Sequence, residues 1–249
     1  MNYSAIPSGT LIGRLLRVPL RLVPHGTHVR ILQGPIRGKR WIVGSSDHGC
    51  WLGSYEYEKQ RRFAAAISSG DVVYDVGAHV GFYSLVASAI AGPTGRVFSF
   101  EPVPENLALL RQHIKLNGAT NCAVWGVAVS NSNGTAGFNI GPSSTSGHLG
   151  DERLGSISVP TVTLDDMVIS GKLPPPNVLK MDIEGGECNA LSGSVQVLEK
   201  YSPKIFLATH GPDLHKICCG LLTDYGYQLE SLDHLPIDKT SEVLAVPRT

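Results

Sequence analysis

The chain has 249 residues, of which 42% are apolar and 17% are charged, a composition typical of a globular protein. No apolar run approaches the ~20 residues that a transmembrane helix needs, and the N-terminus lacks the order of a secretory signal. We therefore expect one α/β domain with an appendage and no transmembrane segment.

The cysteines bear on the cellular compartment. Their number is odd, and no two have the CxxC or similar spacing of a metal or redox site. Reduced thiols in a cytoplasmic protein are the interpretation that we favour. The five cysteines are Cys50, Cys122, Cys188, Cys218 and Cys219.

The formal net charge of zero conceals an asymmetry along the chain. Residues 1–62 contain ten basic residues (lysine and arginine) and three acidic ones. Residues 63–249 contain eleven basic and eighteen acidic residues. A basic N-terminal part could meet an anionic substrate, a membrane surface or a nucleic acid. Alternatively, it docks on the acidic remainder of its own chain or on a second subunit, as in a homodimer. We favour docking because the basic residues are dispersed.

The first part of the chain has a pattern of its own. A short amphipathic, basic stretch at residues 11–16 precedes two expected strands, residues 28–32 and 40–43, around a turn-rich segment. We interpret residues 1–54 as a basic extension with a short helix and a strand pair, and residues 55–249 as the main domain.

Strands and helices alternate from Asp71 onward, as in a mainly parallel sheet, after an expected helix at residues 55–67. Two last strands, residues 228–233 and 242–246, would form a closing antiparallel pair. A loop rich in glycine and serine, residues 141–155, has the length of a lid or substrate loop. The expected fold class is α/β, a doubly wound sheet. Its other strands are residues 72–76, 96–101, 123–129, 178–183 and 204–209, and its helices are residues 81–91, 104–117, 187–199 and 213–225.

The first of these strands runs directly into a glycine-containing loop, Asp75-Val76-Gly77-Ala78-His79-Val80-Gly81. Gly77 permits a tight turn, and Gly81 lets the next helix pack closely. A dinucleotide fingerprint would need glycine where this chain has His79 and Phe82. The loop is therefore poorly suited to a pyrophosphate, which disfavours a nicotinamide dehydrogenase. Asp75 could instead accept hydrogen bonds from an ammonium group.

The second strand ends at Glu101-Pro102, 26 residues after Asp75. A carboxylate at this place can accept hydrogen bonds from both hydroxyls of a ribose, and Asn106 could touch the same region. An amine-binding acid, a loop without pyrophosphate glycines and a ribose-binding acid together suit S-adenosylmethionine as the cofactor.

Further motifs are spread over residues 55–227. They are Tyr57-Glu58, the run from Gly70 to Ser84, the run from Phe100 to Asn106, Asn117-Gly118, Ala128-Val129-Ser130, Thr163-Leu164-Asp165-Asp166 and Lys180-Met181-Asp182-Ile183-Glu184-Gly185-Gly186-Glu187. With these motifs the chain resembles the FkbM family of methyltransferases. The last motif and the glycine loop are the more specific marks of this resemblance.

The resemblance implies the class I methyltransferase fold, a Rossmann-like seven-stranded sheet with strand order 3-2-1-4-5-7-6. It implies S-adenosylmethionine as the donor and usually O-methylation, often of a hydroxyl on a sugar or secondary metabolite. The expected partner is thus a small or glycosylated acceptor. By its position at the end of the third strand, Ala128 would lie near the adenine. The expected cofactor-binding residues are Asp75, Gly77, Ala78, His79, Gly81, Glu101, Pro102, Asn106, Ala128 and Asp182.

Charged residues alternate along the fourth expected strand, where Lys180, Asp182 and Glu184 should point to one side. The two acids fall at its carboxyl end, where the donor methyl should lie, and neighbouring carboxylates raise each other's proton affinity. His210 follows the fifth strand at the same sheet edge and is a second candidate base. We expect Lys180, Asp182, Glu184 and His210 to be the catalytic residues.

A metal is an alternative at this edge of the sheet. Asp165, Asp166, Asp182 and Glu184 could supply oxygen ligands for Mg²⁺. Nothing in their spacing demands an ion, however, and the run from Thr163 to Asp166 is equally typical of a capped helix start. We therefore expect no metal.

Two other functions compete with methylation of a small molecule. The first is a non-catalytic S-adenosylmethionine-binding module, against which the complete set of charged residues on the fourth strand argues. The second is a nucleic-acid methyltransferase that uses the basic extension. The modest charge and the lack of an Asn-Pro-Pro-Tyr motif after the fourth strand disfavour nucleic acid.

Overall fold

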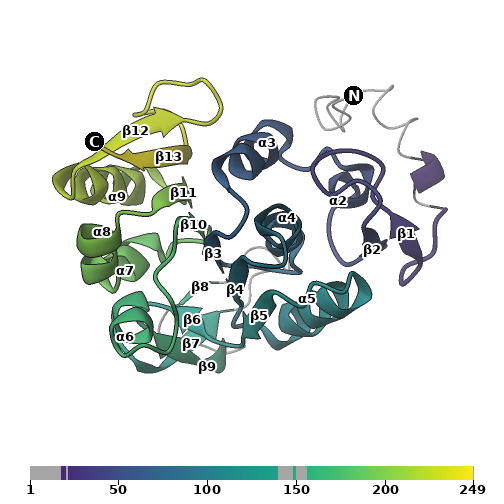
Figure 1. Ribbon diagram of the computed structural model, residues 1–249, viewed down its shortest axis with the longest axis horizontal. Helices are drawn as coiled ribbons and strands as arrows, with labels where there is room; N and C mark the ends of the chain where they lie inside the picture. Colours follow the sequence, from purple (N-terminus) through teal and green to yellow (C-terminus); the bar gives the residue numbers. More distant parts are fainter. Residues whose placement is uncertain (1–17, 21, 140–147, 150–155, 249) are drawn as a thin grey trace.

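The centre of the molecule is a seven-stranded sheet in the order β12-β13-β11-β10-β3-β4-β5 (Figure 1). The computed structural model describes residues 18–20, 22–139, 148–149 and 156–248, so the expected amphipathic stretch at residues 11–16 lies outside the described residues. Numbered along the chain and read from β5, the order is 3-2-1-4-5-7-6, which confirms the predicted sheet. The strands are β3 (Val72–Val76), β4 (Arg96–Phe100), β5 (Cys122–Trp125), β10 (Val178–Met181), β11 (Lys204–Ala208), β12 (Tyr227–Ser231) and β13 (Glu242–Pro247).

Five strands of the sheet are parallel, and two close it. β3 pairs in parallel with β4 and β10, while β4 pairs with β5 and β10 with β11. β13 inserts antiparallel between β11 and β12, which confirms the expected closing pair. The carboxyl ends of β3, β4 and β10 therefore lie side by side at one edge of the sheet.

Both faces of the sheet are covered, as buried parallel strands require. Alternate strand residues point into two apolar clusters: Val73 and Val178 belong to one, and Tyr74 and Leu179 belong to the other. The first cluster packs against α3 (Tyr57–Ala66), α4 (Phe82–Ala91) and α5 (Pro104–Leu116), and the second packs against α6 (Leu164–Ile169), α7 (Glu187–Ser192), α8 (Val195–Tyr201) and α9 (Pro212–Asp224). Within the described part of the chain, no helix combines the length and the apolar character that crossing a membrane requires.

The described part of the N-terminal extension packs into the core of the main domain. β1 (His28–Arg30) and β2 (Arg40–Ile42) form the predicted antiparallel pair, and the short helix α2 (His48–Leu52) follows them. Trp41 and Cys50 join the first apolar cluster together with Phe63 of α3 and Phe82 of α4. This packing agrees with the interpretation that the extension docks on its own chain.

The predicted strand at residues 123–129 is in fact divided between two sheets. β5 belongs to the central sheet, whereas β6 (Ala128–Val129) pairs with β9 (Ser156–Val162) in a second sheet of order β6-β9-β7-β8. The chain turns at Gly126, where a Cβ would lie 2.8 Å from Leu107 Cδ2. The second sheet was not predicted, because β7 (Gly134–Asn139) contains two glycines and lacks clear alternation. β8 (His148–Leu149) lies inside the expected loop, of which residues 141–147 and 150–155 lie outside the described residues.

The predicted helix at residues 187–199 is also divided, into α7 and α8. The break falls at Gly193, where a Cβ would lie 2.1 Å from the carbonyl oxygen of Ser130. The chain thus passes so close to the start of the second sheet that only glycine fits.

Candidate functional site

A cavity opens at the carboxyl ends of β3, β4 and β10. Three of the predicted catalytic residues line it, namely Lys180, Asp182 and Glu184. Two predicted cofactor residues, Asp75 and Gly81, are not in its walls. The predicted cofactor residues in its walls are Gly77, Ala78, His79, Glu101, Pro102, Asn106, Ala128 and Asp182.

The loop between β3 and α4 forms one wall, and its two glycines have different roles. Gly77 has a φ of +76°, and a Cβ there would lie 1.9 Å from the carbonyl oxygen of Asp182. Gly81 has a φ of +96°, and a Cβ there would lie 2.5 Å from Cδ1 of Leu110 in α5. Gly77 therefore lets the loop contact the residue that follows β10. Gly81 instead lets the start of α4 pack closely against α5. The loop also holds His79 in the left-handed region, at a φ of +50°.

Asp75 lies behind the loop and does not face the cavity. Its side chain is fully buried, and Oδ2 accepts a hydrogen bond from Ser84 Oγ at 2.6 Å, while Oδ1 lies 3.4 Å from Lys180 Nζ. That Asp75 receives an ammonium group of the ligand stays a prediction, and in this structure the ammonium that lies beside Asp75 is that of Lys180. An alternating strand sends the side chain of Asp75 into a helix layer, where it positions Lys180.

Glu101 is held rigidly at the end of β4. It accepts hydrogen bonds from the backbone N–H of His79 at 2.8 Å and of Val103 at 3.0 Å, and from Asn106 Nδ2 at 3.3 Å. Its side chain is buried, and burial raises the pKa of its carboxyl above the ordinary value. This carboxylate joins the loop after β3 to the start of α5 and faces the cavity.

Lys180 contacts both the loop after β3 and the acidic residues that follow β10. Its ammonium donates a hydrogen bond to the carbonyl oxygen of Gly77 at 2.8 Å. It also lies 3.4 Å from Asp75 and 3.9 Å from Asp182 Oδ2. A buried cation at this place holds the loop after β3 against the acidic residues that follow β10.

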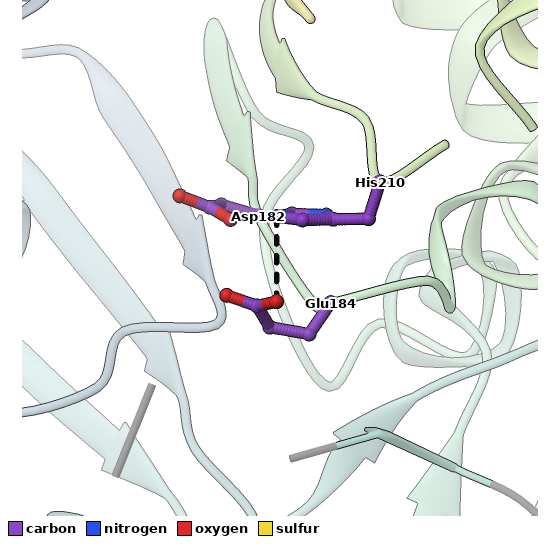
Figure 2. A group of neighbouring side chains, drawn as sticks. All are labelled: Asp182, Glu184 and His210. Carbon is purple, nitrogen blue, oxygen red and sulfur yellow. Dashed lines mark ion pairs between the residues drawn. The ribbon is translucent and has the colours of Figure 1, made fainter. Parts of the chain in front are cut away.

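Asp182, Glu184 and His210 come together beside the cavity, and we call them the carboxylate–histidine group. His210 Nε2 lies 3.7 Å from Asp182 Oδ1 and 3.5 Å from Glu184 Oε2, and Figure 2 shows the ring and both carboxylates directed toward one another. β10 ends at Met181, so the strand alternation that we expected does not reach the two acids. A turn with Glu184 in the left-handed region, at a φ of +52°, brings them together instead.

The charges around this group differ in their effects. Burial opposes the ionisation of Asp182, but Lys180 and Lys59 outweigh it and hold the pKa of this carboxyl below its ordinary value. Burial raises the pKa of Glu184. The hydrogen bond to Glu187 raises the pKa of His210. Of the two acids that the cavity exposes, Glu184 is therefore the stronger base.

Glu187 is a site residue that the sequence analysis did not single out. Its side chain is fully buried, and Oε1 lies 2.9 Å from His210 Nδ1. It also accepts hydrogen bonds from the backbone N–H of Ile183 and of Gly185. The signal was its place at the end of the acidic motif. Only the fold places this carboxylate behind the imidazole.

Lys59 of α3 is a second residue that the sequence analysis missed. Its buried ammonium lies 2.8 Å from Glu242, 3.4 Å from Glu56 and 3.6 Å from Asp182. Burial opposes its charge, and the three carboxylates outweigh burial and raise its pKa. The partners are distant in sequence, so no local pattern identified it.

Apolar and N-terminal residues complete the cavity. Val127, Ala128 and Phe138 form a wall beside Glu101, so Ala128 lies at the cavity although it belongs to the second sheet. Ser46, Cys50 and Tyr55, from the segment before the central sheet, line the cavity as well. The extension therefore contributes directly to the site.

The carboxylate–histidine group could also hold a metal ion, since its three ligand atoms lie within 4.8 Å of one another. The other acids that the sequence suggested as ligands are engaged elsewhere. Asp165 accepts a hydrogen bond from the N–H of Val197 at 2.9 Å, and Asp166 lies 2.9 Å from Lys172. Thr163 Oγ1 accepts a hydrogen bond from the N–H of Asp166, which confirms the capped helix start.

Comparison with protein families matches residues 75–229 to the family described as Methyltransferase FkbM domain. The chain is similar to the hexuronic acid methyltransferase AglP of Haloferax volcanii, with 32% identity over 129 residues. It is also similar to the protein-L-isoaspartate O-methyltransferase of Ignicoccus hospitalis, with 34% identity over 61 residues, or 24% of this chain and 29% of that one. The first similarity covers 52% of each chain, so the chain matches about half the length of that relative.

Solved structures with the same fold include the methyltransferase FkbM of Methylobacillus flagellatus KT. Its TM-score is 0.52 at 18% identity, and the match covers 81% of this chain and 55% of that one. An S-adenosylmethionine-dependent O-methyltransferase of Thermotoga maritima has a TM-score of 0.50 at 12% identity, and the match covers 90% of this chain and 78% of that one. These likenesses concern the fold, and they confirm the predicted class I methyltransferase architecture.

Proposed function

Because this chain belongs to the FkbM methyltransferase family and its cofactor is S-adenosylmethionine, we propose that it methylates a hydroxyl oxygen of a sugar or glycosylated metabolite. The observation that carries this proposal is the carboxylate–histidine group at the edge of the cofactor cavity. It offers a base and two further oxygen or nitrogen atoms to a polar acceptor. Methylation of a hydroxyl needs such a base, because the acceptor must lose its proton.

The similarity to a hexuronic acid methyltransferase supports a sugar acceptor. A hexuronic acid carries several hydroxyls and a carboxylate. In this chain Lys59 and Lys180 lie beside the acids of the site and partly offset their charge. On the ground of this similarity, a small hexuronic acid derivative is the acceptor that we would test first.

The donor set of the cavity fits S-adenosylmethionine. Glu101 is a buried carboxylate already positioned by three donors, and its oxygens can accept hydrogen bonds from the ribose hydroxyls. Beside it, Val127, Ala128 and Phe138 offer an apolar wall for the adenine. Asp182, which also lines the cavity, stays a predicted cofactor residue.

The bound cofactor supplies a sulfonium methyl group, which passes to the acceptor oxygen while the S–CH₃ electron pair returns to sulfur. The residues of the chain position the acceptor and take its proton. We assign the proton to Glu184, because burial raises its pKa while Lys59 and Lys180 hold Asp182 in its ionised form. His210 lies beside Glu184, and Lys180 fixes the loop after β3.

We further propose a cytoplasmic location, for which the five free thiols are the supporting observation. The experiment that tests the proposed function combines calorimetry with mass spectrometry on the full chain. S-adenosylmethionine should bind, and methyl glucuronide or methyl galacturonide should gain one methyl group on oxygen. A neutral methyl glucoside serves as the control for the role of the acceptor carboxylate. Absence of cofactor binding, or binding without methylation of any sugar pool, would refute the proposal.

A further inference from the structure

The reactive atoms of the carboxylate–histidine group face one another without being bonded to one another. Distances of 3.5 and 3.7 Å from His210 Nε2 exceed the about 2.7–3.2 Å of an N–H···O hydrogen bond. Among the described residues, neither His210 Nε2 nor the carboxylate of Glu184 has a hydrogen-bond partner. The three ligand atoms lie within 4.8 Å of one another and converge from the segment after β10 and the segment after β11 (Figure 2).

We propose that Asp182 Oδ1, Glu184 Oε2 and His210 Nε2 bind one divalent transition-metal ion, such as Mn²⁺ or Zn²⁺. Ligand atoms at about 2.0–2.2 Å from one ion lie about 3.0–3.5 Å from each other. The separations of 3.5 and 3.7 Å from His210 Nε2 lie at and just beyond this range, and all three atoms lie within 4.8 Å of one another, so side-chain rotations can bring them onto a common ion. One nitrogen and two oxygens favour a transition metal over Ca²⁺, which takes oxygen ligands.

The surroundings of His210 are those of a metal ligand. Its Nδ1 donates a hydrogen bond to Glu187 Oε1 at 2.9 Å, which leaves the lone pair of Nε2 directed at the two carboxylates. Glu187 is itself fully buried and is held by the N–H groups of Ile183 and Gly185. Metal-binding histidines characteristically donate their second N–H to such a carboxylate, which fixes the tautomer and the ring orientation.

The lysines near Asp182 leave its ligand atom available. Lys59 and Lys180 both lie on the Oδ2 side, at 3.6 and 3.9 Å, whereas Oδ1 faces His210. Asp182, Glu184 and Glu187 place three carboxylates around a single imidazole. A divalent cation at this point would offset the excess of negative charge.

The role of the ion rests on the proposed function. Three protein ligands leave coordination positions open, and two of the three ligands line the cavity. An acceptor hydroxyl bound at an open position would be oriented toward the methyl donor, and its pKa would fall. Its proton would then pass to the second oxygen of Glu184, which does not bind the ion.

The test is a titration of the full chain with Mn²⁺ alone, after treatment with EDTA and gel filtration, followed by electron paramagnetic resonance of the free ion. One Mn²⁺ should bind per chain, and Glu184→Gln and His210→Ala should each weaken binding at least tenfold. Glu184 makes no hydrogen bond among the described residues, so Glu184→Gln should fold normally, as a thermal melt can verify. Asp166→Asn is the matched control, because Asp166 is an exposed acid on α6 that pairs with Lys172. It should bind Mn²⁺ like the unaltered chain.

Absence of saturable Mn²⁺ and Zn²⁺ binding overturns the metal site, and so does unchanged affinity in Glu184→Gln and His210→Ala. The proposed function fails separately from the metal site. If the EDTA-treated chain methylates its acceptor at an unchanged rate and binds no ion, the metal inference is wrong and the proposed function stands. If the chain binds Mn²⁺ through these residues but methylates no sugar, the metal site stands and the proposed function is wrong.

Discussion

His113 Nε2 accepts a hydrogen bond from the backbone N–H of Ile42 at 3.1 Å, which joins α5 to the N-terminal strand pair. The other ring nitrogen, Nδ1, lies 2.7 Å from the carbonyl oxygen of Val80 in the cofactor loop. The ring is fully buried and stacks on Trp41 with centroids 4.0 Å apart. Only the neutral imidazole with its hydrogen on Nδ1 satisfies both contacts, so this ring links the extension and the cofactor loop in one protonation state.

Stability should therefore fall in acid. Burial lowers the pKa of His113 from 6.5 to about 4, so between these values the unfolded chain binds more protons than the folded one. The contribution of the neutral His113 ring to the free energy of unfolding is fully present above pH 6.5 and is lost as the pH falls toward 4. The loss is about 3 kcal/mol at most. Urea unfolding at several pH values measures it, and His113→Gln should flatten the pH dependence. Burial also lowers the pKa of His79 to about 4, so part of the pH dependence of stability should remain in His113→Gln. An unchanged slope in His113→Gln would contradict the assignment.

Replacing Glu101 by Gln should weaken S-adenosylmethionine binding by about 1.5–3 kcal/mol, the scale of a hydrogen bond to a charged group. Glutamine keeps the acceptor for the N–H of His79 but loses the second carboxylate oxygen and the charge. Calorimetry measures the dissociation constant. Glu105→Gln is the control, since Glu105 is an exposed acid in the first turn of α5. Equal affinities for the two variants would remove Glu101 from the ribose role.

Gly77→Ala should both destabilise the chain and displace Asp182. The new Cβ would lie 1.9 Å from the carbonyl oxygen of Asp182, in addition to the cost of about 1–2 kcal/mol for a positive φ. Gly118→Ala is a matched control, because Gly118 also has a positive φ, +59°, but open space around its Cβ position. We expect Gly118→Ala to lose stability only, and Gly77→Ala to lose cofactor binding at least tenfold as well. Cofactor binding that survives in Gly77→Ala would argue against the close approach of the loop and β10.

Lys59→Met should cost about 3 kcal/mol of unfolding free energy, the lower end of the range for breaking a buried pair, because it removes a buried cation from three partly buried carboxylates. Glu56, Asp182 and Glu242 all lie within 3.6 Å of the Lys59 ammonium. Arg62→Met, one turn further along α3, removes a half-exposed pair with Glu230 and should cost no more than about 1 kcal/mol. Chemical denaturation of both variants makes the comparison. Similar losses for the two variants would argue against a buried charge cluster around Lys59.

The positions of most strands and of the cofactor loop could be predicted from local patterns, because apolar alternation identifies a strand and glycines such as Gly77 identify turns with a positive φ. The order of the strands followed from the resemblance to the FkbM family. Parallel strands also end at one edge of the sheet, so Asp182, Glu184 and His210 were expected together. The division of the strand at residues 123–129 was not predictable, because the contact at Gly126 is with Leu107 of a different element.

Charge pairing was decided by the tertiary structure alone. The pattern around Asp75 suggested a ligand for an amine, yet the fold buries this acid against Ser84 and Lys180. Lys59 meets Glu242 across 183 positions of the chain, and Glu187 meets His210 across 23. An ion pair depends on the distance between side chains in space and on their separation from water. The sequence by itself thus determined the fold and the cofactor, while the packing of distant elements decided which acids face the cavity.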